Sequence, residues 1–227
     1  MRVGRLADGL WWWSCPHPAW EPGDNWDAEV VCAYAELPDA TVVIDPLVPS
    51  EPGEAARFLD HLDRDVERRG LPVAVLVTHE WHLRSAPELG RRYGARVWAP
   101  AADERLDGCD RVVMRNGDRP ALGITVHDLG SPAGEFAVAV EHHAAVVFGD
   151  IVAGGDAGPR LAPAAWYDDT AELEAWYRGE APRRVARLLG PPTRFVICGH
   201  GDPVERRADG TWPAGTPGEP GPAPDAA

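Results

Sequence analysis

The segment Val75-Leu76-Val77-Thr78-His79-Glu80-Trp81-His82-Leu83-Arg84 is the most informative part of this 227-residue chain. It begins inside a continuous apolar run, Val73 to Val77, which is typical of a short strand buried on both faces. Polar side chains follow the run at once, beginning with Thr78 and His79. Because α/β proteins carry their functional groups on loops that follow strands, this segment predicts a buried strand leading into a site.

Three other apolar runs end in the same way. Asp45 follows Thr41 to Ile44, Asp150 follows Ala145 to Phe148 and a glycine, and His200 follows Phe195 to Cys198 and a glycine. Together with His79, these residues place two histidines and two carboxylates at strand ends. Such a set is a candidate metal centre or acid–base site, and zinc in particular takes histidine nitrogen and aspartate oxygen as ligands.

The remaining pattern alternates strands with helices. Val30 to Leu37 and Thr41 to Ile44 flank Pro38-Asp39 and predict a hairpin, and the apolar spacing from Ala55 to Val66 predicts a helix that ends at Gly70. The second half is rich in strands and then carries helical patterns before its last strand. An α/β protein with two sheets and helices on their outer faces is the architecture that this order favours.

Four of these segments, in this order, resemble the metallo-β-lactamase fold hydrolase superfamily, which includes hydroxyacylglutathione hydrolases and lactonases. They are Val43-Ile44-Asp45-Pro46, Val75-Leu76-Val77-Thr78-His79, Val147-Phe148-Gly149-Asp150 and Val196-Ile197-Cys198-Gly199-His200-Gly201. The resemblance covers about Leu10 to Val204. It implies an αββα sandwich of two mixed β-sheets flanked by helices, built from a single domain.

The metal-binding motif of this superfamily is degenerate here. The superfamily's signature is Thr-His-x-His-x-Asp-His, and the chain has Trp81 at its second histidine, Leu83 at its aspartate and Arg84 at its last histidine. Ser131 stands where a further histidine is expected. His79, Asp150 and His200 match the remaining metal ligands, so the resemblance implies at most one zinc ion, with His82 as an additional candidate ligand.

Neighbouring residues complete the predicted pocket. The resemblance gives Asp45 a role in ordering the loops near the site, and Trp81, Arg84 and Ser131 occupy former ligand positions. The fixed positive charge of Arg84 would oppose a metal cation and could pair with Asp150 instead. One zinc ion and no metal are therefore both consistent with the sequence, and no catalytic residue is identified.

Two functions from different classes follow. The first is a divergent hydrolase of a small ester, thioester or lactone, with a metal-activated water. The second is a metal-free, catalytically inactive protein that binds a small molecule or a protein through the remnant pocket. Metal-free acid–base catalysis by His79 or His200 is a further alternative. Tryptophans clustered between Trp11 and Trp26 among prolines are expected to line an apolar pocket.

Composition limits the partners. The formal net charge of −14 and the absence of a basic stripe argue against nucleic acid and against an anionic membrane surface. The four cysteines include no Cys-x-x-Cys pair, and the first residues lack a secretory apolar segment, so we expect a cytoplasmic protein with free thiols. We expect residues 1–207 to form the domain and residues 208–227, rich in Gly, Pro and Ala, to be a disordered acidic tail.

Overall fold

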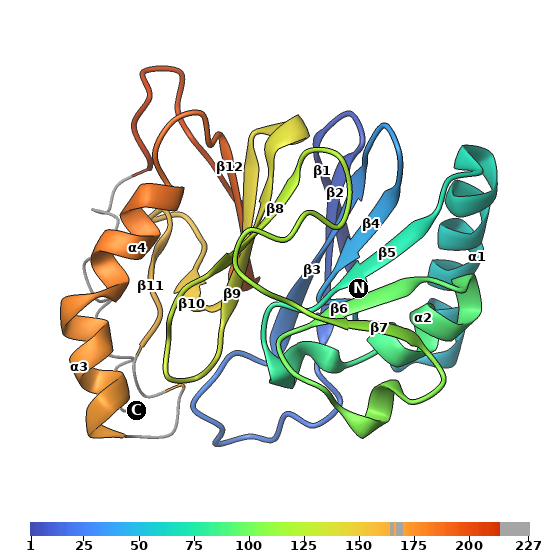
Figure 1. Cartoon of the computed structure of the whole chain (residues 1–227), viewed down its shortest axis with the longest axis horizontal. Coiled ribbons are helices and arrows are strands. Elements are labelled where there is room, and N and C mark those ends of the chain that lie inside the picture. Colours follow the sequence, from blue (N-terminus) through green and yellow to red (C-terminus); the bar gives the residue numbers. More distant parts are fainter. Residues whose placement is uncertain (164–165, 167–169, 214–227) are drawn as a thin grey trace.

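The computed structural model describes residues 1–163, 166 and 170–213, and the strands within them form two sheets (Figure 1). The first sheet has seven strands in chain order: β1 (Arg2–Ala7), β2 (Leu10–Pro16), β3 (Glu29–Glu36), β4 (Thr41–Ile44), β5 (Val73–Leu76), β6 (Arg96–Ala99) and β7 (Asp110–Val113). The second sheet runs in the order β13 (Val204–Glu205), β12 (Phe195–His200), β10 (Ala145–Ala153), β9 (Phe136–Val140) and β8 (Ile124–Asp128), with β11 (Arg160–Leu161) paired to β10.

Both sheets are mixed. In the first sheet, β1 to β4 pair antiparallel, and β4 to β7 pair parallel. In the second, β10 is parallel to β12 and antiparallel to β9. The predicted hairpin is present as β3 and β4, and the apolar run that begins at Val73 is the fully buried strand β5. Parallel neighbours bring their carboxyl ends to one edge of a sheet, which places Asp45 beside the segment that follows β5.

Helices cover the outer face of each sheet (Figure 1). They are α1 (Pro52–Arg69) and α2 (Ala86–Tyr93) beside the first sheet, and α3 (Ala171–Gly179) and α4 (Ala181–Leu188) beside the second, with short 3₁₀ helices η1 (Glu80–Leu83), η2 (Glu104–Leu106) and η3 (Glu141–His143). Helix α1 begins where the Glu51 carboxylate accepts hydrogen bonds from the amides of Gly53 and Glu54, and it ends at Gly70 in the left-handed conformation. The molecule is therefore an αββα sandwich.

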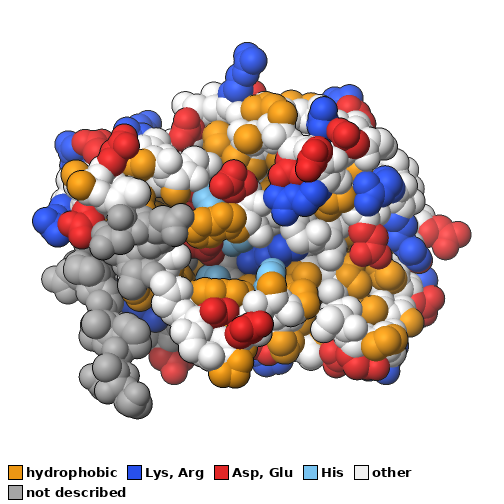
Figure 2. Space-filling view, turned by 90° about the horizontal axis from the view of Figure 1, so that it is seen from below, with side chains coloured by type: hydrophobic (Ala, Val, Ile, Leu, Met, Phe, Trp, Pro, Cys, Tyr) orange, Lys and Arg blue, Asp and Glu red, His pale blue; other side chains and the backbone are white. Residues whose placement is uncertain are grey.

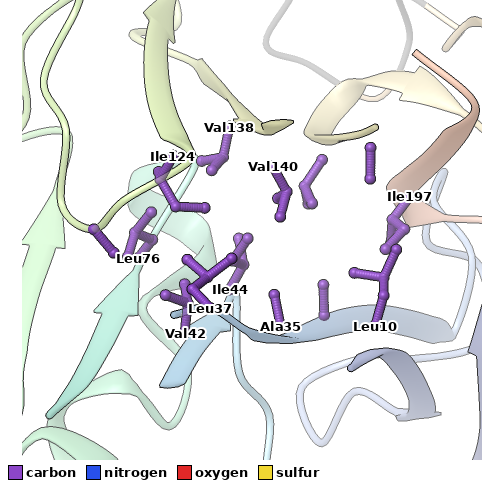
Figure 3. Packing of buried hydrophobic residues seen from close by; sticks show 14 of the residues in the cluster. Leu10, Ala35, Leu37, Val42, Ile44, Leu76, Ile124, Val138, Val140 and Ile197 are labelled. Carbon is purple, nitrogen blue, oxygen red and sulfur yellow. The ribbon is translucent and has the colours of Figure 1, made fainter. Parts of the chain in front are cut away.

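Apolar side chains of both sheets meet in the centre of the sandwich (Figure 3). The labelled residues of this cluster are Leu10, Ala35, Leu37, Val42, Ile44 and Leu76 from the first sheet and its adjoining turn, and Ile124, Val138, Val140 and Ile197 from the second. Each sheet also forms one further apolar cluster with the helices on its outer face. The packed layers hold the strand ends of both sheets in fixed relative positions, which is what a site shared between the sheets requires.

The structure also adds to the sequence pattern. Trp11, Trp12 and Trp13 lie in strand β2, so their side chains alternate, with Trp13 in the core and Trp11 exposed. Residues 208–213 form a turn in which Trp212 packs against the second sheet's cluster, and residues 214–227 of the predicted tail lie outside the described residues. Among the described helices, none is both long and apolar enough to span a bilayer.

Candidate functional site

Three strand ends and the interior of a fourth strand meet at one edge of the sandwich; β10 continues to Ala153, so Asp150 does not follow its strand as the sequence predicts. Asp45 follows β4, the segment Thr78 to Arg84 follows β5, Asp150 lies within β10, and His200 ends β12. The side chains of Asp45, His82, Asp150 and His200 are all buried. Because buried charges are stable only when they are paired, the geometry of these four groups defines the chemistry of the site.

Asp45 ties the ends of the two neighbouring strands together. It has a positive φ of 50°, a conformation that is uncommon for a residue other than glycine. One carboxylate oxygen accepts the amide of Thr78 at 2.7 Å, and the other accepts the Thr78 hydroxyl at 2.5 Å. The loop-ordering position that the resemblance implies for Asp45 is thus matched by its hydrogen bonds.

His82 lies between two carboxylates. Its Nδ1 is 2.9 Å from Asp45 Oδ2, and its Nε2 is 3.0 Å from Asp150 Oδ1. Burial and the nearby Arg84 guanidinium lower the pKa of His82, but the Asp150 and Asp45 carboxylates outweigh them and raise this pKa to about 9. The ring is therefore an imidazolium that donates from both nitrogens, and it crosslinks the two sheets.

Asp150 also contacts His200. The distance from His200 Nε2 to Asp150 Oδ1 is 3.4 Å, and His200 packs edge-on against Trp26 and Trp166, with ring centroids 5.9 and 4.8 Å away. Burial raises the pKa of Asp150, but His82 and His200 more than offset this and hold it well below its usual range. Within the part of the chain that the structure describes, His200 Nδ1 is buried and has no hydrogen-bond partner.

Arg84 does not pair with Asp150, although its sequence position leaves that pairing open. It has φ 35° and ψ −114°, and its Nη1 donates to the backbone carbonyl of Asp45 at 3.2 Å. His82 takes the carboxylate instead, because the short helix η1 turns the His82 ring inward. Counting only the described residues, Arg84 Nε is buried without a hydrogen-bond partner, although the side chain lines a pocket.

His79 and Ser131 lie to one side of this cluster. His79 Nε2 donates to the Ala133 carbonyl at 2.9 Å, and its Nδ1 accepts the Trp81 amide at 3.3 Å. Ser131 Oγ accepts the Ala133 amide at 3.2 Å, in a loop that lines a separate surface hollow. The structure thus brings Asp45, His82, Asp150 and His200 together, but it directs His79 toward the loop of Ser131.

A pocket opens over the cluster. Its volume is about 350 Å³, and Figure 2, which faces this edge, shows a hollow with basic and histidine side chains at its base and hydrophobic ones around it. Its lining residues are His17, Asn25, Trp26, Val30, Trp81, His82, Arg84, Asp150, Trp166 and His200. Burial, and then the charges of Arg84, His82 and His200, lower the pKa of His17 to about 4.

Only part of this lining is predictable from the sequence. Trp81 and Arg84 were predicted, and the proline-rich aromatic segment between β2 and β3 contributes Trp26, as the clustered tryptophans suggested. The sequence pattern does not predict that His17, Asn25 and Trp166 line the pocket. His17 follows the strand end at Pro16 and lies nine residues from Trp26, so its place in the same aromatic segment was the available signal.

The donor set as arranged does not fit a zinc ion. Both ring nitrogens of His79 and both of His82 are committed to protein groups, which leaves Asp150 and His200. Among the described residues, no group of three or more His, Cys, Asp or Glu side chains is arranged to hold a metal ion. Catalytic zinc needs three protein ligands, and here the cationic side chains of His82 and Arg84 line the same pocket.

Comparison with known proteins identifies the fold. No family model and no curated protein matches the sequence. Among solved structures, the chain is similar to a metallo-β-lactamase from Erythrobacter litoralis (14% identity, 90% of this chain and 86% of that one, TM-score 0.60). It is also similar to metallo-β-lactamases from Hirschia baltica (17%, 90% and 92%, 0.60) and from Pseudomonas aeruginosa, FIM-1 in its mono-zinc form (15%, 90% and 89%, 0.59). The chain therefore has the metallo-β-lactamase fold, and the predicted αββα sandwich is confirmed.

Proposed function

We propose that this protein is a metal-free protein of the metallo-β-lactamase fold, which binds a small molecule in the pocket at the strand ends. The observation that carries this proposal is the position of His82 between the carboxylates of Asp45 and Asp150. Its imidazolium supplies both carboxylates with the positive charge that a bound cation supplies in a metal site. A side chain of the protein thus supplies the counter-charge of both buried carboxylates, and a pocket remains above them.

Arg84 supports the same conclusion. Its guanidinium lines the pocket and carries a positive charge that proteins do not remove. A divalent cation placed among Asp150 and His200 would be repelled both by this charge and by the His82 imidazolium. Metal binding would therefore require two cationic side chains to move away from hydrogen bonds that they now make.

A hydrolase of a small ester, thioester or lactone with one zinc ion is the second candidate. Asp150 and His200 remain adjacent and line the pocket, and FIM-1, which shares the fold, has been observed in a mono-zinc form. This candidate requires His82 or His79 to leave its present partners. The arrangement of the described residues favours the metal-free protein.

Metal content separates the two candidates. The protein, purified without a histidine tag and dialysed against zinc and then against metal-free buffer, is analysed by mass spectrometry. We expect far less than one zinc ion per chain, and the same result for Asp150→Ala. About one zinc ion per chain in the wild type, lost in both Asp150→Ala and His200→Ala, would refute the proposal and establish a mononuclear site.

A further inference from the structure

We infer that the ligand of this pocket is a small organic monoanion, whose carboxylate is bound by Arg84 and whose flat apolar part lies against Trp26, Trp81 and Trp166. This inference rests on the proposed function, because it names the class of molecule that the metal-free pocket binds.

The first argument is the unused hydrogen-bonding capacity of Arg84. A guanidinium has five N–H donors in a planar fork, and the one hydrogen bond that Arg84 makes among the described residues goes to the Asp45 carbonyl. In the described part of the chain neither buried acid of the cluster pairs with it: Asp45 is bound by Thr78 and His82, and Asp150 by His82 and His200. A planar fork with open donors at a pocket wall matches a carboxylate, which accepts two parallel hydrogen bonds.

The second argument is the backbone of Arg84. Its φ of 35° and ψ of −114° lie in a region that side chains other than glycine rarely adopt. The segment is fixed on both sides, since the His82 ring is held by two carboxylates and Ser85 Oγ accepts the Val48 amide at 2.9 Å. Strained residues of this kind persist where the surroundings determine them, and they concentrate at ligand sites. Here the strain accompanies a guanidinium that lines the pocket.

The third argument is the electrostatic environment of the pocket. His17 also lines the pocket, next to Trp26. Burial lowers the pKa of His17 most, the charges of Arg84, His82 and His200 lower it further, and the Asp150 carboxylate acts in the opposite direction. The pocket therefore disfavours an added positive charge at this point. A single negative charge suits it better than several, because the chain carries −14 overall and two buried carboxylates lie beneath the pocket.

The last argument is the aromatic wall. Trp26 and Trp166 meet His200 edge-on, while Trp81 meets His79 at a centroid distance of 4.6 Å and keeps 47% of its surface exposed at the pocket rim. Three indoles line the pocket and provide aromatic surface for an apolar group, and the volume of about 350 Å³ lies at the small end of the range for organic ligands.

Matched probes test the inference. Phenylacetate, indole-3-acetate and 1-naphthoate are compared with their carboxamides, which keep the shape and lose the charge, by titration calorimetry and ligand-observed NMR. We expect the wild type to bind at least one carboxylate about tenfold or more tightly than its amide, as a charge-assisted bidentate contact requires. This preference should disappear in Arg84→Gln and persist in Arg64→Gln, which removes the same charge from an exposed position of α1.

Each result decides a separate point. Amides that bind as well as the carboxylates overturn the anion assignment and leave the proposed small-molecule pocket standing. A preference that survives in Arg84→Gln overturns the role of Arg84. If no probe binds, the inference is overturned, and the zinc measurement then decides independently about the metal-free state. Should Arg84→Gln fail to fold, Arg84→Lys keeps the charge without the fork and should bind the carboxylate more weakly while still preferring it to the amide.

Discussion

At the scale of single residues, the site depends on His82, whose ring lies between two buried carboxylates and, in the proposed metal-free protein, supplies the positive charge that they need. One imidazolium meets Asp45 on one side and Asp150 on the other, so two buried acids share one counter-charge. The partners come from different sheets and are 37 and 68 residues away in sequence. Removing this ring would leave both carboxylates buried without their main partner.

His82→Ala is therefore expected to destabilise the protein by about 3–5 kcal/mol, which is the usual cost of removing one partner from a buried ion pair. Urea unfolding followed by circular dichroism measures the change. His61→Ala, at an exposed position of α1, is the control and should change the free energy of unfolding by less than about 0.5 kcal/mol. A loss in His82→Ala no larger than in the control would show that the two acids do not need this cation.

His17 gives the site a pH dependence. Its pKa is about 4 in the folded protein and near 6.5 in an unfolded chain, so the unfolded chain binds this proton more tightly. Stability from His17 is then fully present above pH 6.5 and is lost as the pH falls from 6.5 toward 4.

The unfolding midpoint in urea, measured between pH 7.5 and pH 4.5, should fall more steeply in the wild type than in His17→Gln. The difference between the two curves isolates this histidine from the other acids that titrate in the same range. Parallel curves would mean that His17 is not held in its neutral form by the fold.

At the scale of elements, the site requires close approach between β10 and β12. A Cβ on Gly199 would lie 3.0 Å from Asp150 Oδ1, from the Gly149 carbonyl oxygen and from His82 Cε1. Position 199 therefore requires glycine because a larger side chain would contact Asp150 and His82, and its backbone conformation does not itself require glycine.

Gly199→Ala is expected to destabilise the protein by about 1–3 kcal/mol, because the extra methyl group overpacks the cluster. Gly179→Ala, in α3 with nothing within 4 Å of the added Cβ, is the matched control and should stabilise slightly. Thermal unfolding of both variants measures the difference. Equal melting temperatures would show that β10 and β12 can separate without cost.

The elements also show how far the sequence could be interpreted. Continuous apolar runs such as Val73 to Val77 predict buried strands, because a strand that is buried on both faces carries apolar side chains at every position. The sequence does not predict strand β2, because three consecutive tryptophans show no alternation between apolar and polar side chains. At the site, the apolar runs predict the ends of β4, β5 and β12, but β10 continues past Asp150 to Ala153. The direction of His82 and Arg84 depends on the turn of η1, which residue identity alone does not determine.

At the scale of the whole molecule, the site is distributed over both halves of the sandwich. The first sheet and the segment after β5 supply Asp45, His82 and Arg84, and the second sheet supplies Asp150 and His200. The central apolar cluster fixes the distance between the two sheets, so the pocket forms only when both have assembled. A protein of the same fold can therefore change its chemistry through a few side chains at this edge while the layers stay as they are.

The His82 bridge has a consequence for how such a protein depends on its surroundings. A centre held by a metal ion couples folding to the supply of that ion, so scarcity or a chelator weakens the protein. In the metal-free protein proposed here, the protonated His82 ring joins the same two acids. The proton that it carries comes from water and is always available. Folding of such a protein would not depend on the zinc supply, and the folded state would keep its stability in cells that lack zinc.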